Sequence, residues 1–468
     1  MRRTKLIATL GPATDAPGVL DALVAGGLDV ARLNTSHGTR ADLERRLAAL
    51  RASAEAHGRH VGAMLDLGGA KVRVGAMAPA TILVAGSEFS LLTGAEPAGP
   101  GDALAAWVSH PGLADDVSPG NRILLDDGRI ELVVLASDAG VVRTRVEVGG
   151  PLASRKGVNV PNVTLGVDSI TARDLDDLAW ALDVGIDLVA QSFVRTPDDV
   201  VRLREAMGER RIPVVAKIEK HEAVAALEAI VEAADGVMVA RGDLGVELAT
   251  EQVPVVQRRV IAACRATGTP VIVATQMLES MTEARRPTRA EASDVANAIF
   301  AGVDAVMLSG ETAVGRDPAH VLATMDRIVR VAEAEAVDAP SGPRPAAVDD
   351  VAAAVSRAAC DLAHDLDLAA IVTATQSGAT ARSVAAYRPQ VPVLAATPDA
   401  VIARRLALVW GVHPTVVGRY ESADGMIAAA AGAARASGLA GDGDLIAVTG
   451  GVSMHVAGAT DFVQVHRL

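Results

Sequence analysis

The residues best suited to chemistry in this sequence follow short apolar runs. Lys217 and Glu219 lie two residues apart at the end of the run that begins at Val214, and strand alternation puts both side chains on one face. Asp243 follows the next run, within the glycine-rich segment Met238–Gly245. Glu219 and Asp243 offer hard oxygen ligands that suit Mg²⁺ or Mn²⁺, and Lys217 offers positive charge. Together they predict metal-dependent phosphoryl transfer, which needs positioning and positive charge more than covalent help.

Simpler explanations exist for each residue alone. A Lys and a Glu at this spacing also form an ordinary ion pair at a strand end, and Asp243 fits plain turn chemistry. Polar groups at the ends of successive runs favour a common site, because catalytic groups of parallel barrels gather at the carboxyl ends of the strands. The other run ends carry Arg32, which suits bidentate phosphate contact, and Asp66, Thr275 and Glu311.

Eight strand-like runs alternate with segments of helical period. One helix is expected to begin at Thr171, because Thr171-x-x-Asp174 is a capping-box pattern. Eight strands with helices between them predict an α/β fold, a closed (β/α)₈ TIM barrel. An open doubly wound sheet is the alternative that strand count leaves open. The runs are Leu6–Leu10, Val30–Leu33, Val61–Leu67, Ile186–Ser192, Val214–Ile218, Gly236–Ala240, Val271–Thr275 and Ala305–Leu308.

About a hundred residues separate the third run from the helix at Thr171, too many for a structureless loop. They predict an inserted all-β domain over residues 68–155, which enters and leaves at the barrel mouth and could act as a lid. The barrel itself is then discontinuous, with residues 1–67 and 156–337. The expected strands of the insert are Ala80–Ala85, Glu88–Leu92, Asn121–Leu125, Ile130–Leu135 and Val141–Val148.

A proline-rich linker, Asp338–Pro345, precedes a second region of alternating helices and strands. It predicts a C-terminal α/β domain over residues 346–468. The expected elements there are Val351–His364, Ala369–Ala374, Ala379–Ala386, Val391–Ala396, Asp444–Val448 and Phe462–His466.

Composition narrows the function classes. Hydrophobic residues make up 50% of the 468 and charged residues 22%, so the chain can build buried cores. A formal charge of −13 disfavours nucleic acid as a partner, and no apolar stretch approaches the ~18 residues of a membrane span. The N-terminal apolar run is too short for a signal peptide. Cys264 and Cys360 are expected to be small core residues of a cytoplasmic protein that has no membrane partner.

At this point the sequence resembles the pyruvate kinase family over nearly its whole length. The resemblance implies transfer of the phosphoryl group of phosphoenolpyruvate to ADP, with pyruvate and ATP as products, and dependence on Mg²⁺ or Mn²⁺. It also implies a homotetramer. The segments that carry it are Thr4–Thr14, Ala31–Gly38, Lys217–Glu222, Met238–Gly245, Ala274–Met281, Arg286–Asn297 and Met307–Thr312.

The resemblance also implies roles for individual residues. Lys217 would stabilise the phosphoryl group in flight, Arg32 would contact the substrate phosphate, and Thr275 would help a water deliver the proton to the enolate carbon. Glu219 and Asp243 would hold the metal, while the backbone N–H groups of Gly242 and Asp243 would hold the substrate carboxylate. Glu311 would lie at the floor of the site. The expected nucleotide-side residues are Asn34, His37, Arg73 and Lys156.

The segment after Asp66 departs from the family pattern. Potassium-dependent members usually have Thr, Lys and Glu where this chain has Leu67, Gly68 and Lys71. An ammonium supplies the same single charge as K⁺, and potassium-independent members carry this Lys and an apolar residue. The resemblance therefore predicts activity without K⁺, with Lys71 as the substitute cation; Gly68 has no evident rationale. The predicted monovalent-cation site comprises Asn34, Ser36, Asp66, Leu67 and Lys71.

Thr375, Ser377, Gly378 and Thr380 follow a strand and precede a helix, an arrangement that predicts a phosphate nest. Allosteric members of the family bind a phosphorylated sugar there, although their usual Arg is Ala379 here. A plain helix cap is the simpler reading. Two rival functions stay open: a barrel lyase or aldolase that acts through a pyruvate enolate, and a catalytically broken metabolite sensor.

Overall fold

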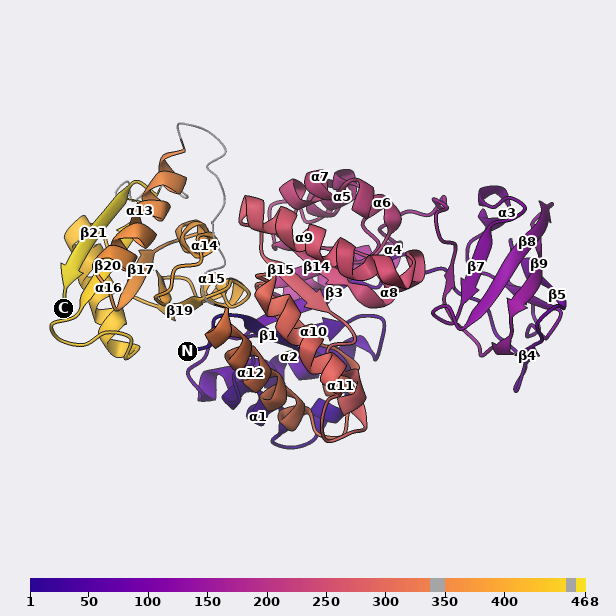
Figure 1. Cartoon of the computed structure of the whole chain (residues 1–468), viewed down its shortest axis with the longest axis horizontal. Helices are drawn as coiled ribbons and strands as arrows, with labels where there is room; N and C mark the ends of the chain where they lie inside the picture. The colour runs from indigo at the N-terminus through magenta and orange to yellow at the C-terminus, as the bar shows by residue number, and fades with distance from the viewer. Residues whose placement is uncertain (337–349, 452–459) are drawn as a thin grey trace.

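Eight parallel strands close into a barrel at the centre of the molecule (Figure 1). The computed structural model describes residues 1–336, 350–451 and 460–468. Around the barrel the strands follow the order β1-β16-β15-β14-β13-β12-β3-β2, so every strand pairs with two neighbours. This closure confirms the predicted barrel and rules out the open sheet. The strands are β1 (Lys5–Thr9), β2 (Val30–Asn34), β3 (Gly62–Asp66), β12 (Leu188–Gln191), β13 (Val214–Ile218), β14 (Gly236–Ala240), β15 (Val271–Ala274) and β16 (Ala305–Leu308).

Helices surround this barrel and bury its outer face. The predicted capping box is present: the Thr171 hydroxyl accepts a hydrogen bond from the Asp174 N–H at 3.1 Å and fixes the start of α4. The helices are α1 (Val19–Ala25), α2 (Arg40–Ala56), α4 (Ala172–Val184), α5 (Pro197–Ala206), α6 (His221–Ala225), α7 (Leu227–Ala233), α8 (Arg241–Glu247), α9 (Val253–Thr267), α10 (Arg289–Phe300), α11 (Gly310–Ala313) and α12 (Pro318–Glu335), with 3₁₀ turns at Pro12–Asp15, Thr250–Gln252 and Glu279–Thr282.

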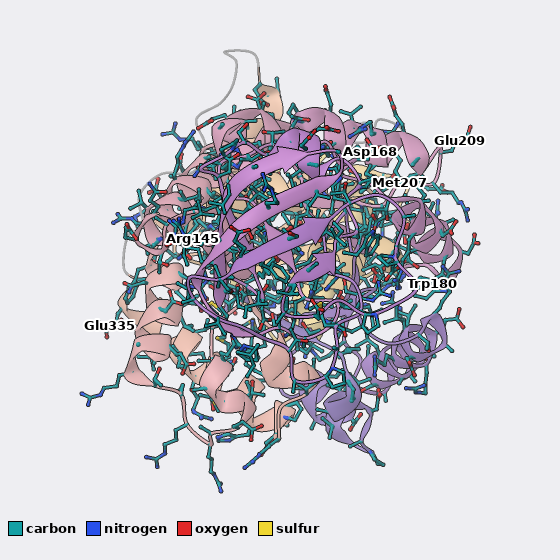
Figure 2. All side chains as sticks on the ribbon, turned by 90° about the vertical axis from the view of Figure 1, so that its right-hand side faces the viewer. Arg145, Asp168, Trp180, Met207, Glu209 and Glu335 are labelled. Atoms are coloured by element: carbon teal, nitrogen blue, oxygen red, sulfur yellow. The ribbon has the colours of Figure 1, made fainter. Side chains whose placement is uncertain are left out.

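A separate β domain with its own core leaves the barrel after β3 and returns before α4. Its larger sheet has the order β11-β7-β8-β9-β5-β6, and β4 pairs with β10. Figure 2, viewed from the side of the β domain, shows its strands, with Arg145, in front of the barrel. The elements are β4 (Ile82–Leu83), β5 (Glu88–Leu92), β6 (Ala105–Trp107), α3 (Leu113–Asp116), β7 (Arg122–Leu125), β8 (Ile130–Asp138), β9 (Val141–Val148), β10 (Gly150–Pro151) and β11 (Val158–Asn159). The predicted run at Ala80 is shorter than expected.

The C-terminal region forms a five-stranded sheet, order β19-β18-β17-β20-β21, with helices on both faces. The linker Asp338–Pro345 and the predicted domain limits 337 and 346 lie outside the described residues. The elements are α13 (Val351–Asp365), β17 (Ala370–Ala374), α14 (Ala379–Ala386), β18 (Val393–Thr397), α15 (Ala400–Leu406), β19 (Val412–Val416), α16 (Ala423–Ala436), β20 (Leu445–Gly450) and β21 (Phe462–Arg467).

This C-terminal domain packs against the base of the barrel, where the strands begin, and the β domain lies at the opposite end (Figure 1). Arg404 Nε lies 2.8 Å from Oδ1 of the buried Asp187, just before β12. Lys5 Nζ donates to the Val412 carbonyl at 2.6 Å. In the part of the chain that the structure describes, no helix is long and apolar enough to cross a membrane. Cys264 is buried and Cys360 half-buried, and both are free thiols.

Candidate active site

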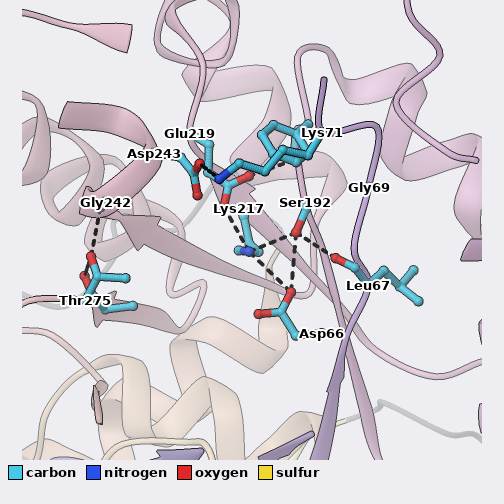
Figure 3. Close-up of polar contacts among 12 residues, drawn as sticks. Asp66, Leu67, Gly69, Lys71, Ser192, Lys217, Glu219, Gly242, Asp243 and Thr275 are labelled. Atoms are coloured by element: carbon cyan, nitrogen blue, oxygen red, sulfur yellow. Dashed lines mark hydrogen bonds and ion pairs between the residues drawn. The ribbon is translucent and has the colours of Figure 1, made fainter. Parts of the chain in front are cut away.

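Lys217 of β13 lies at the centre of a polar cluster at the carboxyl end of the barrel (Figure 3). Its Nζ atom is 2.8 Å from Ser192 Oγ, 3.2 Å from Asp66 Oδ1 and 2.9 Å from Glu219 Oε1. As predicted, Lys217 and Glu219 face the same way. Burial alone would lower the pKa of Lys217, but Asp66 and Glu219 outweigh it and raise that pKa. The ammonium therefore stays charged in a site sheltered from water.

Asp66 at the end of β3 joins Lys217 to Arg32 of β2. Arg32 Nε lies 2.7 Å from Asp66 Oδ2, and Arg32 Nη1 donates to Thr9 Oγ1 at 3.1 Å. Burial opposes ionisation of Asp66, yet Lys217 and Arg32 hold the pKa of this carboxyl below its usual value. The buried Asp66 carboxylate thus holds the side chains of Lys217 and Arg32 close to each other. Two neighbouring cations of this kind can bind the oxygens of one phosphate group.

Glu219 is buried, and both of its oxygens have polar neighbours. Its Oε2 accepts a hydrogen bond from the Phe193 N–H at 2.8 Å. Its Oε1 is buried and is paired with the Lys217 ammonium at 2.9 Å. Burial raises the pKa of Glu219, and the Asp243 charge adds to this effect. A buried carboxylate next to Asp243 offers hard oxygen ligands of the kind that Mg²⁺ takes, so Glu219 is compatible with the predicted role of metal ligand.

Asp243 lies in the first turn of α8 with a side chain 27% exposed. Its charge acts on Glu219, which places the two predicted metal ligands within electrostatic reach of each other. Within the described ranges no group of three or more His, Cys, Asp or Glu side chains could hold a metal ion. Mg²⁺ commonly takes one or two carboxylates and completes its shell with water and substrate oxygens, so two carboxylates are compatible with it.

Lys71 contacts different partners from those expected. Its Nζ atom lies 2.9 Å from Asp243 Oδ1 and 3.8 Å from Asp127 Oδ1 (Figure 3). The remaining residues of the predicted monovalent-cation site are engaged elsewhere: Leu67 O accepts from Ser192 Oγ at 2.7 Å, and Asn34 Oδ1 accepts from the Ser36 N–H at 3.0 Å. Lys71 therefore brings its charge to the metal-ligand side of the site.

Thr275 follows β15 in an unusual backbone conformation. Its φ is +67°, which is rare for a β-branched residue and costs of order 1–3 kcal/mol. The Thr275 hydroxyl accepts from the Gly242 N–H at 2.8 Å and donates to the Ala274 carbonyl at 2.6 Å. The strained turn thus holds Thr275 against the backbone of α8, where the sequence predicted substrate-carboxylate contacts at Gly242 and Asp243.

Two predicted nucleotide-side residues lie where the chain enters and leaves the β domain. Arg73 pairs with Gly157 as an isolated bridge, and Lys156 Nζ lies 2.7 Å from Asp126 Oδ1. His37 lies near enough to Arg32 and Arg73 for both charges to lower its pKa, after the larger effect of burial. The two segments that connect the β domain to the barrel therefore place Arg73 near His37.

Glu311 lies at the floor and is buried. Its Oε1 accepts from the Leu278 N–H at 3.1 Å and its Oε2 from the Ser309 N–H at 2.6 Å. Both carboxylate oxygens thus fix the loops that follow β15 and β16.

The hydroxyls of the predicted effector loop have partners within the C-terminal domain. Thr375 Oγ1 accepts from the Gly378 N–H at 2.9 Å, and Thr380 Oγ1 lies 2.8 Å from Thr460 Oγ1. The Ala379 N–H reaches Ser377 Oγ at 3.4 Å.

Ser192 is the site residue that sequence reasoning missed. It is 4% exposed, follows β12, and joins Lys217, Asp66 and the Leu67 carbonyl. Ser192 lies at the carboxyl end of a buried strand, and the same kind of position indicated Lys217 and Thr275 as candidate site residues.

Comparison with known proteins fits this geometry. Residues 1–322 match the family described as "Pyruvate kinase, barrel domain" and residues 353–466 match "Pyruvate kinase, alpha/beta domain". The chain is 44% identical to a pyruvate kinase of Geobacillus stearothermophilus, covering 99% of this chain and 80% of that protein. It is 43% identical to one of Mycobacterium intracellulare (100% and 98%) and 41% identical to one of Clostridium acetobutylicum (99% and 99%).

Fold and site together define an enzyme of the phosphotransferase class, built on a (β/α)₈ barrel with a C-terminal α/β domain. Family matches over both regions, and relatives above 40% identity along nearly the whole chain, make the assignment specific. The chain belongs to the pyruvate kinase family.

Proposed function

We propose that this enzyme transfers the phosphoryl group of phosphoenolpyruvate to ADP, giving pyruvate and ATP, with Mg²⁺ or Mn²⁺. The observation that carries the proposal is the convergence of Lys217 and Glu219 from the end of β13 and of Asp66 from the end of β3 on one buried space. The names of the relatives support the same reaction. We further propose that the enzyme works in the cytoplasm as a homotetramer.

In the proposed reaction the bond between phosphorus and the enol oxygen breaks, and a terminal oxygen of ADP forms the new bond to phosphorus. Lys217 neutralises charge on the equatorial oxygens, and Arg32 holds one of them. Asp66 keeps both cations in position. Glu219 and Asp243 would hold the divalent cation, which supplies further positive charge to the phosphate and the enolate when it is bound.

The substrate carboxylate is assigned to the backbone N–H groups of Gly242 and Asp243. The Gly242 N–H donates to Thr275 Oγ1 in the structure, so substrate must displace this hydrogen bond. The released Thr275 hydroxyl then orients a water that protonates the enolate carbon and completes pyruvate. A Thr hydroxyl is too weak an acid to deliver that proton unaided.

Arg73 and Lys156 are assigned to the nucleotide phosphates, with Asn34 and His37 on the same side. Burial and neighbouring cations lower the pKa of His37, which keeps its imidazole neutral at physiological pH. We therefore assign His37 a hydrogen-bonding role and no acid–base role.

We also propose that turnover does not require K⁺. Lys71 supplies a fixed positive charge next to Asp243, and Leu67 removes a polar side chain from the predicted cation site. Turnover in KCl should match turnover in a tetraalkylammonium chloride of equal ionic strength. Strong activation by K⁺ would contradict this part of the proposal.

The reaction is tested with a lactate-dehydrogenase-coupled assay that contains phosphoenolpyruvate, ADP and MgCl₂. Pyruvate formation that requires all three supports the proposal. Pyruvate formation without ADP, or none with the complete mixture, would overturn it.

A further inference from the structure

Glu247, the last residue of α8, is a buried carboxylate to which the proposed reaction assigns no role. Its side chain has no exposed surface. Burial of a charge costs free energy unless partners compensate it, so the partners of such a residue indicate what its burial achieves. The partners of Glu247 come from two other parts of the chain, and both parts lead to the active site.

Lys220 supplies the compensating positive charge. Its Nζ atom lies 2.6 Å from Glu247 Oε1, and only 14% of its side chain is exposed. Lys220 directly follows Glu219 in the chain. The ion pair therefore fixes the backbone at the end of β13, which carries one of the two proposed metal ligands. A longer contact adds to it, because His221 Nδ1 lies 3.8 Å from Glu247 Oε2.

Asn159 connects Glu247 to the β domain. Its side-chain Nδ2 donates to Glu247 Oε1 at 2.9 Å, and Asn159 is itself buried. It belongs to β11, which pairs with β7 of the β-domain sheet and lies where the chain returns from that domain to the barrel. One carboxylate oxygen of Glu247 is thus shared between this returning connection and Lys220.

The outgoing connection holds the other end of the same helix. Lys71 lies on that connection, and its Nζ atom is 2.9 Å from Asp243 Oδ1 (Figure 3). Asp243 and Glu247 are four residues apart, so their side chains lie one turn apart on one face of α8. The two connections are also joined to each other, because the Val158 N–H donates to the Val72 carbonyl at 2.9 Å. Both connections of the β domain therefore contact one short helix that carries a proposed metal ligand.

We propose that Glu247 is a positioning residue for the divalent-cation site. It fixes α8 against the returning connection of the β domain and against the end of β13, so that Asp243 and Glu219 keep their relative positions. This role rests on the proposed function, which assigns the cation to these two carboxylates. Partners beyond the metal ligands orient them, and their loss typically lowers metal affinity by about 10–100-fold.

A purely structural role would give a different result. Loss of a buried ion pair that only stabilises the fold would lower the melting temperature and leave the metal affinity of the folded protein unchanged. The contribution of the β-domain connection can be measured separately, because the Asn159 hydrogen bond can be removed without a change of charge.

Electron paramagnetic resonance titration of the full chain with Mn²⁺ tests the proposal. Glu247→Leu should raise the dissociation constant about tenfold, and Asn159→Leu should raise it about threefold, as expected for loss of one neutral hydrogen bond. Because Asn159 acts through Glu247, the double variant should bind Mn²⁺ no more weakly than Glu247→Leu alone. Glu291→Leu is the matched control and should bind as wild type does. Glu291 is a partly buried carboxylate that accepts hydrogen bonds from the Ser280 and Thr288 N–H groups instead.

Circular dichroism establishes that each variant folds, and Asn159→Leu carries the test if Glu247→Leu does not fold. The proposal is overturned if the dissociation constant of either folded variant stays within twofold of wild type, or if Glu291→Leu weakens Mn²⁺ binding as much as Glu247→Leu does. Fully additive effects in the double variant would overturn it as well. Because the titration measures metal binding without turnover, failure here is distinguishable from failure of the phosphotransfer assay.

Discussion

Single buried charges decide the chemistry of the active site. Asp66 forms ion pairs with both Lys217 and Arg32. Removal of either cation therefore leaves the buried Asp66 carboxylate with only one positively charged partner. Glu219 differs, because its own charge is opposed by burial and by the neighbouring Asp243, while Lys217 is its cationic partner at 2.9 Å. Two carboxylates that raise each other's cost of ionisation gain from a nearby divalent cation, which is the basis for the proposed metal role of Glu219 and Asp243.

Replacement of Glu219 by Gln should weaken Mn²⁺ binding about 10–100-fold, because an amide keeps the shape but removes the charge that attracts the cation. Electron paramagnetic resonance titration measures the dissociation constant. Glu228→Gln is the matched control, since Glu228 is exposed on α7 and pairs with Arg259 rather than with any residue of the cluster. Equal Mn²⁺ affinity in both variants would remove Glu219 from the metal site.

The residue types of the site were predictable because they follow buried strands, whereas some of their contacts were not. Alternation put Lys217 and Glu219 on one face, and the observed 2.9 Å separation confirms it. The contact between Lys71 and Asp243 joins residues 172 positions apart through an irregular loop, and no local pattern encodes such a contact. Ser192 was missed because serine is common in the turns that follow strands, so its presence there does not indicate a functional site.

At the scale of elements, the loop after β3 is fitted closely to the loop after β12. Gly69 has a φ of +63°, and a Cβ built on it would lie 2.6 Å from Phe193 Cδ2. Phe193 in turn donates its N–H to Glu219. The Gly69 N–H is held by Asp174 Oδ1 at 3.0 Å, so the cap of α4 anchors the same loop.

Gly69→Ala should therefore destabilise the protein by about 1–3 kcal/mol through overpacking and a strained backbone. It should also weaken Mn²⁺ binding, because displaced Phe193 no longer orients Glu219. Urea unfolding and metal titration measure the two effects. Gly99→Ala is the control, since nothing lies within 4 Å of a Cβ there and its φ is not positive. An unchanged unfolding midpoint in Gly69→Ala would refute the packing argument.

Elements with strong apolar runs were predictable, and those without were not. The eight barrel strands are almost wholly buried and therefore appear as continuous β-branched and aliphatic runs. β19 escaped prediction because it is an edge strand that contains His413, Pro414 and Thr415. The helix α16 also escaped prediction. Most of its residues are alanine, so its sequence shows no clear helical alternation of apolar and polar side chains. The short β6 has only three residues.

At the scale of the whole molecule, the barrel stands between two attachments with different chemistry. The β domain is joined to its mouth by two segments that form the isolated bridge Arg73–Gly157, and the C-terminal domain meets its base through ion pairs such as Arg404–Asp187. His413 lies in this base contact. Burial, followed by the charge of Lys5, lowers the pKa of His413 to about 3.

This shift predicts that acid loosens the molecule at its base. The unfolded chain protonates His413 near pH 6.5 while the folded chain does not until about pH 3, so the contribution of His413 to stability is lost as pH falls through that window. At pH 5 the loss should be about 1–2 kcal/mol. His413→Gln should flatten the fall in melting temperature between pH 7 and pH 5, and the exposed His364→Gln should not. Parallel curves for wild type and His413→Gln would contradict this account.

The central claim is that the Lys217 ammonium, held by Asp66 and Ser192, stabilises the phosphoryl group in flight. The most direct test follows phosphoenolpyruvate and ADP by ³¹P nuclear magnetic resonance with wild type and with Lys217→Met. We predict that the variant binds Mn²⁺ and phosphoenolpyruvate nearly as wild type does. Its rate of ATP formation should be lower than that of wild type by roughly 10³-fold or more. ATP formation by Lys217→Met within tenfold of the wild-type rate would contradict the account.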